Sequence, residues 1–356
     1  MDKKQDGVQE AASQLVKLLR DAELKQSDAL WLEAATAIVA HARAQAGGCM
    51  SRKWQRAAEA ARTIPALIGI MSHAAAPPAL KLDAVDALRL TVCTNDINQS
   101  AAAASSAAQV LLRLITVLPP PPPASEGPKA AVLARNVGEQ LRDAALEALA
   151  DLVHLHKPSQ DAAVAASAIP PLISFIYCTG PPNLNPIATQ RAALRALTNL
   201  TRSNVGGVTC AGCMVSCWPR CSSDARKVNA TAAAADAGAL AALVAAGRSR
   251  LVAADTQELV AAALVSLVQH PGVADAACAQ GVLSLMIDIL RAQPPGSLAL
   301  EALTCSCMML YGRGDACALA AKDGLLPLLQ QLRTQGFGDE FDARCDNCEA
   351  ALQHHI

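Results

Sequence analysis

The chain has 356 residues, enough for two or three globular domains or for one extended array of repeats. Its 30 basic and 31 acidic side chains give a formal net charge of -1, which excludes a global positive field that would concentrate nucleic acid or an anionic membrane. Hydrophobic residues make up 52% of the chain but aromatic residues only 2%, so Ala, Leu, Val and Ile must fill the interior. These small residues favour closely packed helices over strands, and we expect an all-α fold.

The amino-terminal sequence MDKKQDGVQEAASQL lacks the apolar run of a signal peptide, and apolar runs elsewhere are too short to span a bilayer or contain a charge. Thirteen cysteines is an odd number. Several are predicted to lie singly on apolar helical faces, where a reduced thiol acts as a small hydrophobe: Cys93, Cys278, Cys305, Cys307 and Cys317. We therefore expect a protein of a reducing compartment, the cytoplasm or the nucleus, without membrane insertion.

One unit recurs along the chain: a small-residue stretch, often with a glycine, then Ile or Leu near a proline, a loop, and a helix rich in alanine and leucine. The apolar residue that opens the middle helix of each unit is found at Leu15, Ile64, Leu111, Ile169, Leu240, Leu283 and Leu326. The last two intervals are both 43 residues, which we take as the native period. A fixed period of this length indicates a helical repeat array, with capping repeats predicted at 1–50 and 315–356.

Proline and glycine mark the turns inside these units. In the segments 61–70, 167–176 and 323–332 a proline enters the first helical turn, where its missing N–H costs nothing. Gly238, Gly281 and Gly324 lie just upstream of middle helices and suit a sharp turn between two helices.

Two intervals exceed the period, and each contains a segment unsuited to a helix. The 58-residue interval from Leu111 to Ile169 contains PPPPPASEGPKA (119–130), predicted to be a non-helical loop that serves as a spacer or as a ligand for a proline-binding domain. The 71-residue interval before Leu240 contains a cysteine-rich segment, 203–224, predicted to be a second loop insertion.

A 43-residue unit of a short, a middle and a long helix resembles the armadillo repeat, most clearly in DAAVAASAIPPLI followed by RAALRALTNL. The resemblance covers nearly the whole chain as seven degenerate units. It implies a right-handed superhelical solenoid of the armadillo type or the related HEAT type, acting as a non-enzymatic protein-interaction scaffold. In the armadillo pattern Ala-x-Trp-Ala-Leu-x-Asn-Leu, the Trp and Asn of the third helix face a concave groove. Here Asn199 fills the Asn position and Arg195 the Trp position.

The other units depart from this pattern. Their Trp position is assigned to Thr36, Asp86, Glu147, Ala262, Glu301 and Ala350. Their Asn position is assigned to Ala40, Leu90, Asp151, Ser266, Cys305 and His354. Nuclear import adaptors of this family depend on serial Trp and Asn pairs, so the departure argues against that role.

Charge on the third helices predicts the chemistry of the groove. Asp143, Glu147 and Asp151 recur every four residues and share one helical face. A groove that is acidic except at one repeat with basic residues would suit an extended segment that carries several Lys or Arg and one acidic residue. The predicted protein-binding residues are Asp86, Asp143, Glu147, Asp151, Arg191, Arg195, Asn199, Arg202, Glu258, Ser266 and Glu301. Two alternatives remain open: these charges form an ordinary solvated surface, and Asn199 bonds within its own repeat.

Two cysteine clusters are candidate metal sites. Four thiols in the second insertion, Cys210, Cys213, Cys217 and Cys221, could hold a tetrahedral zinc, although the two separated CxxC arms of common zinc sites are missing. The insertion could equally be a plain loop or an unspliced fragment. Cys345 and Cys348 could bind a metal with His354 and His355, or they could face the core of the last repeat.

Familiar enzyme motifs are missing: the sequence has no GxxxxGK[ST], HExxH or GxSxG. We assign no catalytic residue and no cofactor. The expected partner is an extended or helical segment of another protein, bound by a monomer that does not bind nucleic acid. Alternative functions are a zinc-stabilised or redox-responsive module and a cochaperone, because some exchange factors for cytosolic heat-shock proteins resemble short armadillo arrays.

Overall fold

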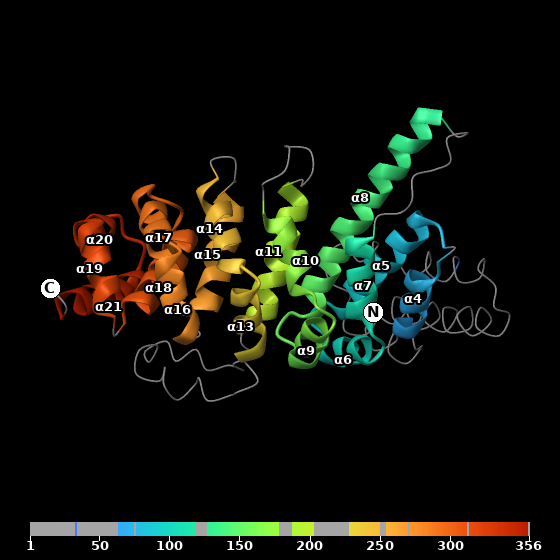
Figure 1. The fold of residues 1–356 in the computed structure, drawn as a ribbon, viewed down its shortest axis with the longest axis horizontal. Helices are drawn as coiled ribbons and strands as arrows, with labels where there is room; N and C mark the ends of the chain where they lie inside the picture. Colours follow the sequence, from blue (N-terminus) through green and yellow to red (C-terminus); the bar gives the residue numbers. More distant parts are fainter. Residues whose placement is uncertain are drawn as a thin grey trace, which may run out of the picture. The chain divides into compact units, whose positions relative to one another are not determined.

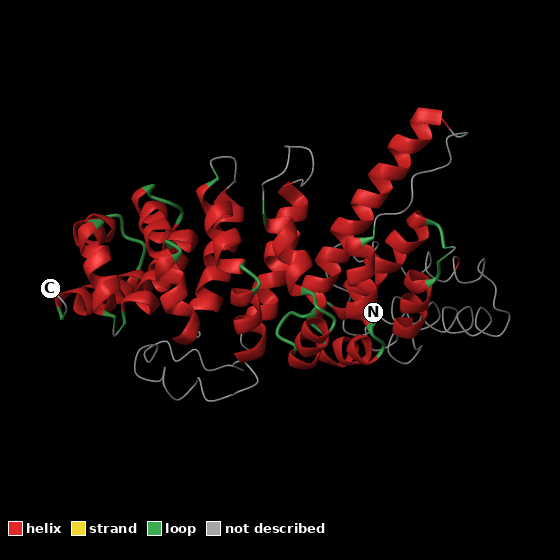
Figure 2. Cartoon of the chain, in the orientation of Figure 1, coloured by secondary structure: helices red, strands yellow, loops and turns green. Residues whose placement is uncertain are grey.

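The computed structural model describes residues 63–74, 76–117, 127–177, 187–202, 228–249, 254–269, 271–311 and 313–354, together with Glu33. All regular secondary structure in these ranges is helical, which confirms the all-α expectation (Figure 2). The predicted capping repeat at 1–50, apart from Glu33, and the cysteine-rich segment 203–224 lie outside the described residues.

The described helices follow one another in sets of three, as the repeat predicts (Figure 1). The first helices are α6 (Asp96–Ala104), α9 (Lys157–Ala165), α13 (Val228–Asp236), α16 (Pro271–Ala279) and α19 (Gly314–Lys322). The middle helices are α4 (Thr63–Ser72), α7 (Ala107–Thr116), α10 (Ile169–Ile176), α14 (Ala239–Arg248), α17 (Val282–Arg291) and α20 (Leu325–Arg333). The third helices are α5 (Pro78–Val92), α8 (Gly127–Leu152), α11 (Ile187–Thr201), α15 (Ala254–Val268), α18 (Gly296–Leu310) and α21 (Asp339–Gln353).

The chain divides into two compact units, residues 1–171 and 172–356, with the boundary inside α10. In the first unit α8 packs against α5 and α7, and α4 packs against α5. In the second unit the third helices lie in chain order, with α15 between α11 and α18 and with α21 against α18. Each third helix from α15 onward also packs on the middle helix of its own repeat. Neighbouring repeats therefore share one continuous core within each unit.

The core consists of aliphatic side chains at close quarters. Leu283, Met286 and Leu290 of α17 are fully buried, as are Leu264 and many alanines of the third helices. Helices approach closely where residues are small: a Cβ added at Gly247 of α14 would lie 2.8 Å from Leu285 Cδ2 on α17. Small residues thus set the spacing between successive repeats, which explains why 2% aromatic residues suffice.

The turn between first and middle helices has the same backbone conformation in successive repeats. Gly238, Gly281 and Gly324 all have positive φ, between 74° and 85°, and directly precede their middle helices, as predicted. Ser106 and Ser167 adopt φ of 62° at the corresponding turns before α7 and α10. Each of these turns therefore contains one residue in the left-handed conformation, and in two repeats that residue is a serine instead of a glycine.

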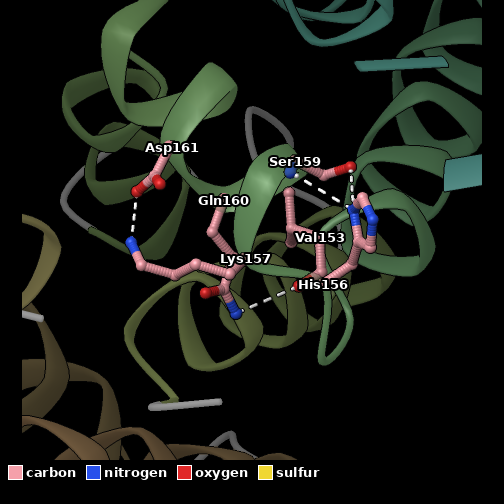
Figure 3. Close-up of polar contacts among 6 residues, drawn as sticks. All are labelled: Val153, His156, Lys157, Ser159, Gln160 and Asp161. Atoms are coloured by element: carbon pink, nitrogen blue, oxygen red, sulfur yellow. Dashed lines mark hydrogen bonds and ion pairs between the residues drawn. The ribbon is translucent and has the colours of Figure 1, made fainter. Parts of the chain in front are cut away.

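Polar side chains at the starts of α6 and α9 bond to the ends of the third helices before them. The side chain of Asn95 accepts the backbone N–H of Asn98 at the start of α6, and His156 accepts that of Ser159 at the start of α9 (Figure 3). Four residues after each cap, a glutamine reaches the carboxyl end of a third helix. Gln160 Nε2 donates to Val153 O at 3.2 Å, while Lys157 pairs with Asp161 on the same helix (Figure 3).

Gln99 makes the longer-range version of this contact. Its Nε2 lies 2.9 Å from Asp151 O, 3.2 Å from Leu152 O and 3.1 Å from His154 O, at the end of α8, the third helix of the same repeat. Helix ends leave backbone carbonyls without intrahelical donors, so this amide satisfies groups that burial would otherwise strand. Cys317 occupies the same position in α19, with its Sγ 3.4 Å from Leu310 O and 3.6 Å from Ala351 O.

Two local expectations are wrong. The segment 119–130 is not entirely a loop, because α8 begins at Gly127. Pro128 then falls in the first helical turn, which tolerates its missing N–H. Cys93 does not sit in a helix as a free thiol: it caps the carboxyl end of α5 and is disulfide-bonded.

Among the described helices, none alone has both the length and the hydropathy needed to cross a bilayer. Two bent pairs, 230–236 with 239–248 and 272–279 with 282–291, meet those limits together by length and composition. Each pair consists of the first and the middle helix of its own repeat.

Candidate functional site on the third helices

The structure places every predicted groove residue on a third helix or directly after one. Asp86 lies on α5, and Asp143, Glu147 and Asp151 lie on α8. Arg191, Arg195 and Asn199 lie on α11, which Arg202 follows directly. Glu258 and Ser266 lie on α15, and Glu301 lies on α18. Because third helices are neighbours within each unit, the sequence register does bring these residues onto adjacent elements.

The two positions of the armadillo pattern differ in exposure. The Trp position is half-buried in α5, α8, α11 and α15, at Asp86, Glu147, Arg195 and Ala262. The Asn position, four residues later, is buried at Asp151, Asn199 and Ser266, where only 8%, 6% and 5% of the residue is exposed. Within each unit, the Trp-position side chains are therefore more accessible than those at the Asn position.

The register assigned to the last two repeats is wrong by three residues. The helices α15, α18 and α21 each have fifteen residues and begin at Ala254, Gly296 and Asp339. The residues equivalent to Ala262 and Ser266 are Thr304 and Met308 in α18, and Asn347 and Ala351 in α21. A shift of three residues turns a helix by only about 60°, so the alanine and leucine pattern cannot distinguish the two registers.

In the first unit, the acidic stripe of α8 meets a cation that sequence reasoning missed. Arg89 Nε on α5 lies 4.0 Å from Asp151 Oδ2, and the Asp151 side chain is only 10% exposed. Arg89 lies one helical turn after Asp86, a spacing that places both on one face of α5. Asp151 is thus partly neutralised inside its own unit.

In the second unit, two polar contacts join α11 to α15. Arg191 pairs with Asp255 at 2.8 Å, with both side chains about half exposed, a geometry worth about 0 to 1 kcal/mol. Thr201 Oγ1 and Ser266 Oγ lie 2.6 Å apart, and Ser266 Oγ also donates to Ala263 O at 2.8 Å. The hydroxyl of Ser266 is thus engaged within the fold.

Glu301 is the centre of a group of charges drawn from successive repeats. Burial raises the pKa of its carboxyl above the usual value, and the carboxylates of Glu258 and Glu340 act in the same direction. The guanidinium groups of Arg202 and Arg344 oppose this by favouring the ionised form. We call these five residues, from α15, α18, α21 and the end of α11, the Glu301 cluster.

Sequence reasoning missed Glu340 and Arg344, although a signal for them exists. The two residues are four apart on α21, and Arg344 Nη2 lies 3.3 Å from Glu340 Oε1. Glutamate followed by arginine at this spacing is a typical pair on one helix face. Glu340 and Arg344 were overlooked because the incorrect register of the last helix assigned its two pattern positions to Ala350 and His354.

The predicted metal sites have different outcomes. Cys210, Cys213, Cys217 and Cys221 lie outside the described residues. Cys345 and Cys348 are fully buried, which confirms that they face the core of the last repeat. Burial raises the pKa of Cys345 to about 11, so this thiol is not prepared as a thiolate ligand. Within the described ranges, no group of three or more Cys, His, Asp or Glu side chains is arranged to hold a metal.

No model of a known protein family matches the sequence. No curated protein matches it either. Among solved structures, an engineered protein is 17% identical, with a TM-score of 0.62, over 82% of this chain and 97% of its own. A designed armadillo repeat protein has the same TM-score at 13% identity, over 81% of this chain and 99% of its own. A third, described as a designed armadillo repeat protein in complex with the peptide (KR)4, has a TM-score of 0.60 at 13% identity, over 81% of this chain and 99% of its own.

Identities this low carry information about the fold alone. The likeness nevertheless spans about four fifths of the chain, and it agrees with the three-helix sets and the left-handed turns described above. The chain has the all-helical fold of armadillo repeat proteins.

Proposed function

We propose that this protein is a non-enzymatic interaction scaffold, which binds an extended segment of a protein partner along the surface of its third helices. The armadillo repeat fold is commonly a protein-binding scaffold, and at least one designed neighbour is described in complex with a peptide. A scaffold fits the charge-balanced composition as well, because it needs no global field and works through local patches.

The Glu301 cluster is the observation that carries this proposal. Charged groups of α15 and α21, together with Arg202 directly after α11, act on the half-buried carboxyl of Glu301 in α18, so charged side chains of successive repeats lie near one another. Desolvating Glu301 is unfavourable in the free protein, because burial disfavours its charged form. A cationic group of a partner placed beside Glu258 and Glu301 would offset this cost, while Arg202 and Arg344 would orient an acidic group.

The ligand chemistry follows from these charges. The segment would carry Lys or Arg side chains that alternate with at least one Asp or Glu, in an extended conformation. In the second unit, the half-buried Trp-position residue Arg195 would contact it, whereas the buried Asn199 would expose only a small part of its side chain. The expected compartment remains the cytoplasm or the nucleus.

Selection from a displayed library of random peptides tests the proposal even though the partner is unidentified. Peptides selected on the full chain should be enriched in basic residues and should lose at least about tenfold in affinity for a Glu258→Arg variant. Asp236→Lys, an exposed substitution on the first helix α13, is the matched control and should leave affinity unchanged.

Equal binding to the wild type, Glu258→Arg, Arg195→Glu and Glu147→Lys would refute the third-helix surface as the binding site. Thermal unfolding of each variant, measured beforehand, separates lost binding from lost folding.

A further inference from the structure

Two cysteines of neighbouring third helices lie in contact. Cys307 of α18 and Cys348 of α21 have their Sγ atoms 2.7 Å apart, although they are 41 residues apart in the chain. Both are free thiols. The Sγ of Cys307 also lies 3.2 Å from Arg344 O, which accepts its S–H. The contact therefore joins the last two repeats of the second unit through side chains on facing surfaces of α18 and α21.

The distance is short enough for covalent chemistry. A disulfide has its sulfur atoms about 2.05 Å apart, so the two Sγ atoms must approach by only about 0.7 Å. The helices that carry them are already packed together, and side-chain rotation can supply most of this movement. Cys317 of α19 differs, because its Sγ lies near two backbone carbonyls, Leu310 O and Ala351 O.

The two thiols differ in access. Cys307 is half-buried, whereas Cys348 is fully buried. Burial also raises the pKa of Cys348, which disfavours its thiolate. An external reagent therefore meets Cys307 first, and Cys348 is placed to react with whatever Cys307 carries.

We propose that Cys307 and Cys348 form a reversible disulfide, which cross-links α18 to α21. The oxidant is a low-molecular-weight disulfide such as oxidised glutathione. This modification site is separate from the cysteine-rich insertion, and it adjoins the Glu301 cluster through the contact of Cys307 Sγ with the backbone carbonyl of Arg344.

The exchange proceeds in two balanced steps. Cys307 loses its proton, and its thiolate attacks one sulfur of the oxidant, forming a mixed disulfide and releasing one glutathione thiolate that takes up the proton. Cys348 then loses its proton and attacks Cys307 Sγ, which expels the second glutathione as a thiolate that is protonated in turn. Two protein thiols lose two electrons, and the oxidant gains them as two thiols.

The cross-link would tie the last repeat, α19 to α21, to the repeat before it. A closed loop of about forty residues restricts the unfolded chain and so disfavours opening of the α19 to α21 repeat.

Peptide mapping of the full chain tests the assignment. The protein is equilibrated with oxidised glutathione, quenched in acid, alkylated and digested with trypsin. The expected product joins peptide 292–313 to peptide 345–356, with fragmentation placing the bond between Cys307 and Cys348, and reduced glutathione should release it. Cys307→Ser should abolish this product, and the matched control Cys278→Ala should retain it.

Three results would overturn the proposal: a bond that maps to Cys305 or Cys345, glutathione adducts on Cys307 without the linked peptides, or separately alkylated thiols after equilibration with a large excess of oxidised over reduced glutathione. Hydrogen exchange of α21 gives a second, independent readout. Exchange should slow by at least about tenfold on oxidation of the wild type and not of Cys307→Ser. Equal exchange rates in oxidised and reduced wild type would also count against the cross-link.

Discussion

Gln99 offers the sharpest test of how the first and third helices of a repeat are held together. We consider Gln99→Met, which keeps the length of the side chain but removes its amide. In the structure Gln99 Nε2 lies within 3.2 Å of three backbone carbonyls at the end of α8, and these groups lie in a buried region. The amide has two N–H groups, so at most two of these contacts are strong hydrogen bonds at one time.

The expected loss follows from those two bonds. A buried hydrogen bond contributes about 1 kcal/mol net, and an acceptor stranded without a donor costs about 1 to 3 kcal/mol. We therefore expect Gln99→Met to lower the free energy of unfolding by about 2 to 3 kcal/mol. Gln160→Met is the matched control, because Gln160 is the equivalent glutamine of α9 and its Nε2 donates to Val153 O at 3.2 Å. It should cost about 1 kcal/mol.

Urea unfolding followed by circular dichroism measures both variants, and hydrogen exchange locates the effect. The amides in the last turn of α8 should exchange faster in Gln99→Met than in Gln160→Met. If Gln99→Met unfolded at the same urea concentration as the wild type, with an unchanged slope, the capping of α8 by α6 would not contribute to stability and our reasoning would be refuted.

Other predictions concern charge and backbone conformation. Burial lowers the pKa of His156 below its usual 6.5, and the nearby Asp96 opposes this shift, so the contribution of His156 to stability should be complete above pH 6.5 and fall as the pH drops below 6.5. His156→Asn, which copies the cap of the preceding repeat, should remove this pH dependence in unfolding titrations. The pKa of Glu301 is raised by burial, so its contribution to the free energy of unfolding is fully present below the unfolded-state pKa of 4.5 and is lost as the pH rises through the folded-state pKa. Glu301→Gln should make the free energy of unfolding vary less with pH, and an unchanged pH profile would argue against burial of this carboxyl. Ser167→Gly should stabilise the protein by about 1 kcal/mol, because glycine adopts a positive φ without the strain that serine has there, whereas Gly281→Ala should destabilise it by about 1 to 2 kcal/mol. Equal melting temperatures for the two variants would contradict the shared left-handed turn.

The repeat pattern alone located the middle helices correctly. Ile64, Leu111, Ile169, Leu240, Leu283 and Leu326, each predicted to open a middle helix, lie in α4, α7, α10, α14, α17 and α20. The glycines before three of these helices have the positive φ that their position predicted. These features are local: helix propensity, apolar spacing and the steric freedom of glycine act within a few residues, so they can be recognised in the sequence of one chain.

The serine turns show where local reasoning stops. Ser106 and Ser167 have a positive φ, as those glycines do, but serine has no preference for this conformation that the sequence could have indicated. The surrounding helices force the turn, and the packing of the repeat tolerates the strain.

The candidate site was located only in part by the sequence. The predicted residues do lie on or directly after third helices, because the charges follow the helical period, while their part in binding stays a prediction. The register of α18 and α21 was wrong, since a shift by three residues keeps the same side chains near the same face. Glu340 and Arg344 were missed for this reason, and they became recognisable only through their action on Glu301.

Contacts between helices far apart in the chain were decided by the tertiary structure alone. Gln99 reaches carbonyls more than fifty residues away, and Cys307 meets Cys348 across 41 residues. Such contacts depend on how far one helix is rotated and shifted along its neighbour, by fractions of a helical turn. A single sequence with many equivalent alanines and leucines fixes the identity and order of its helices, but the close packing of the folded chain selects one rotation and one shift for each.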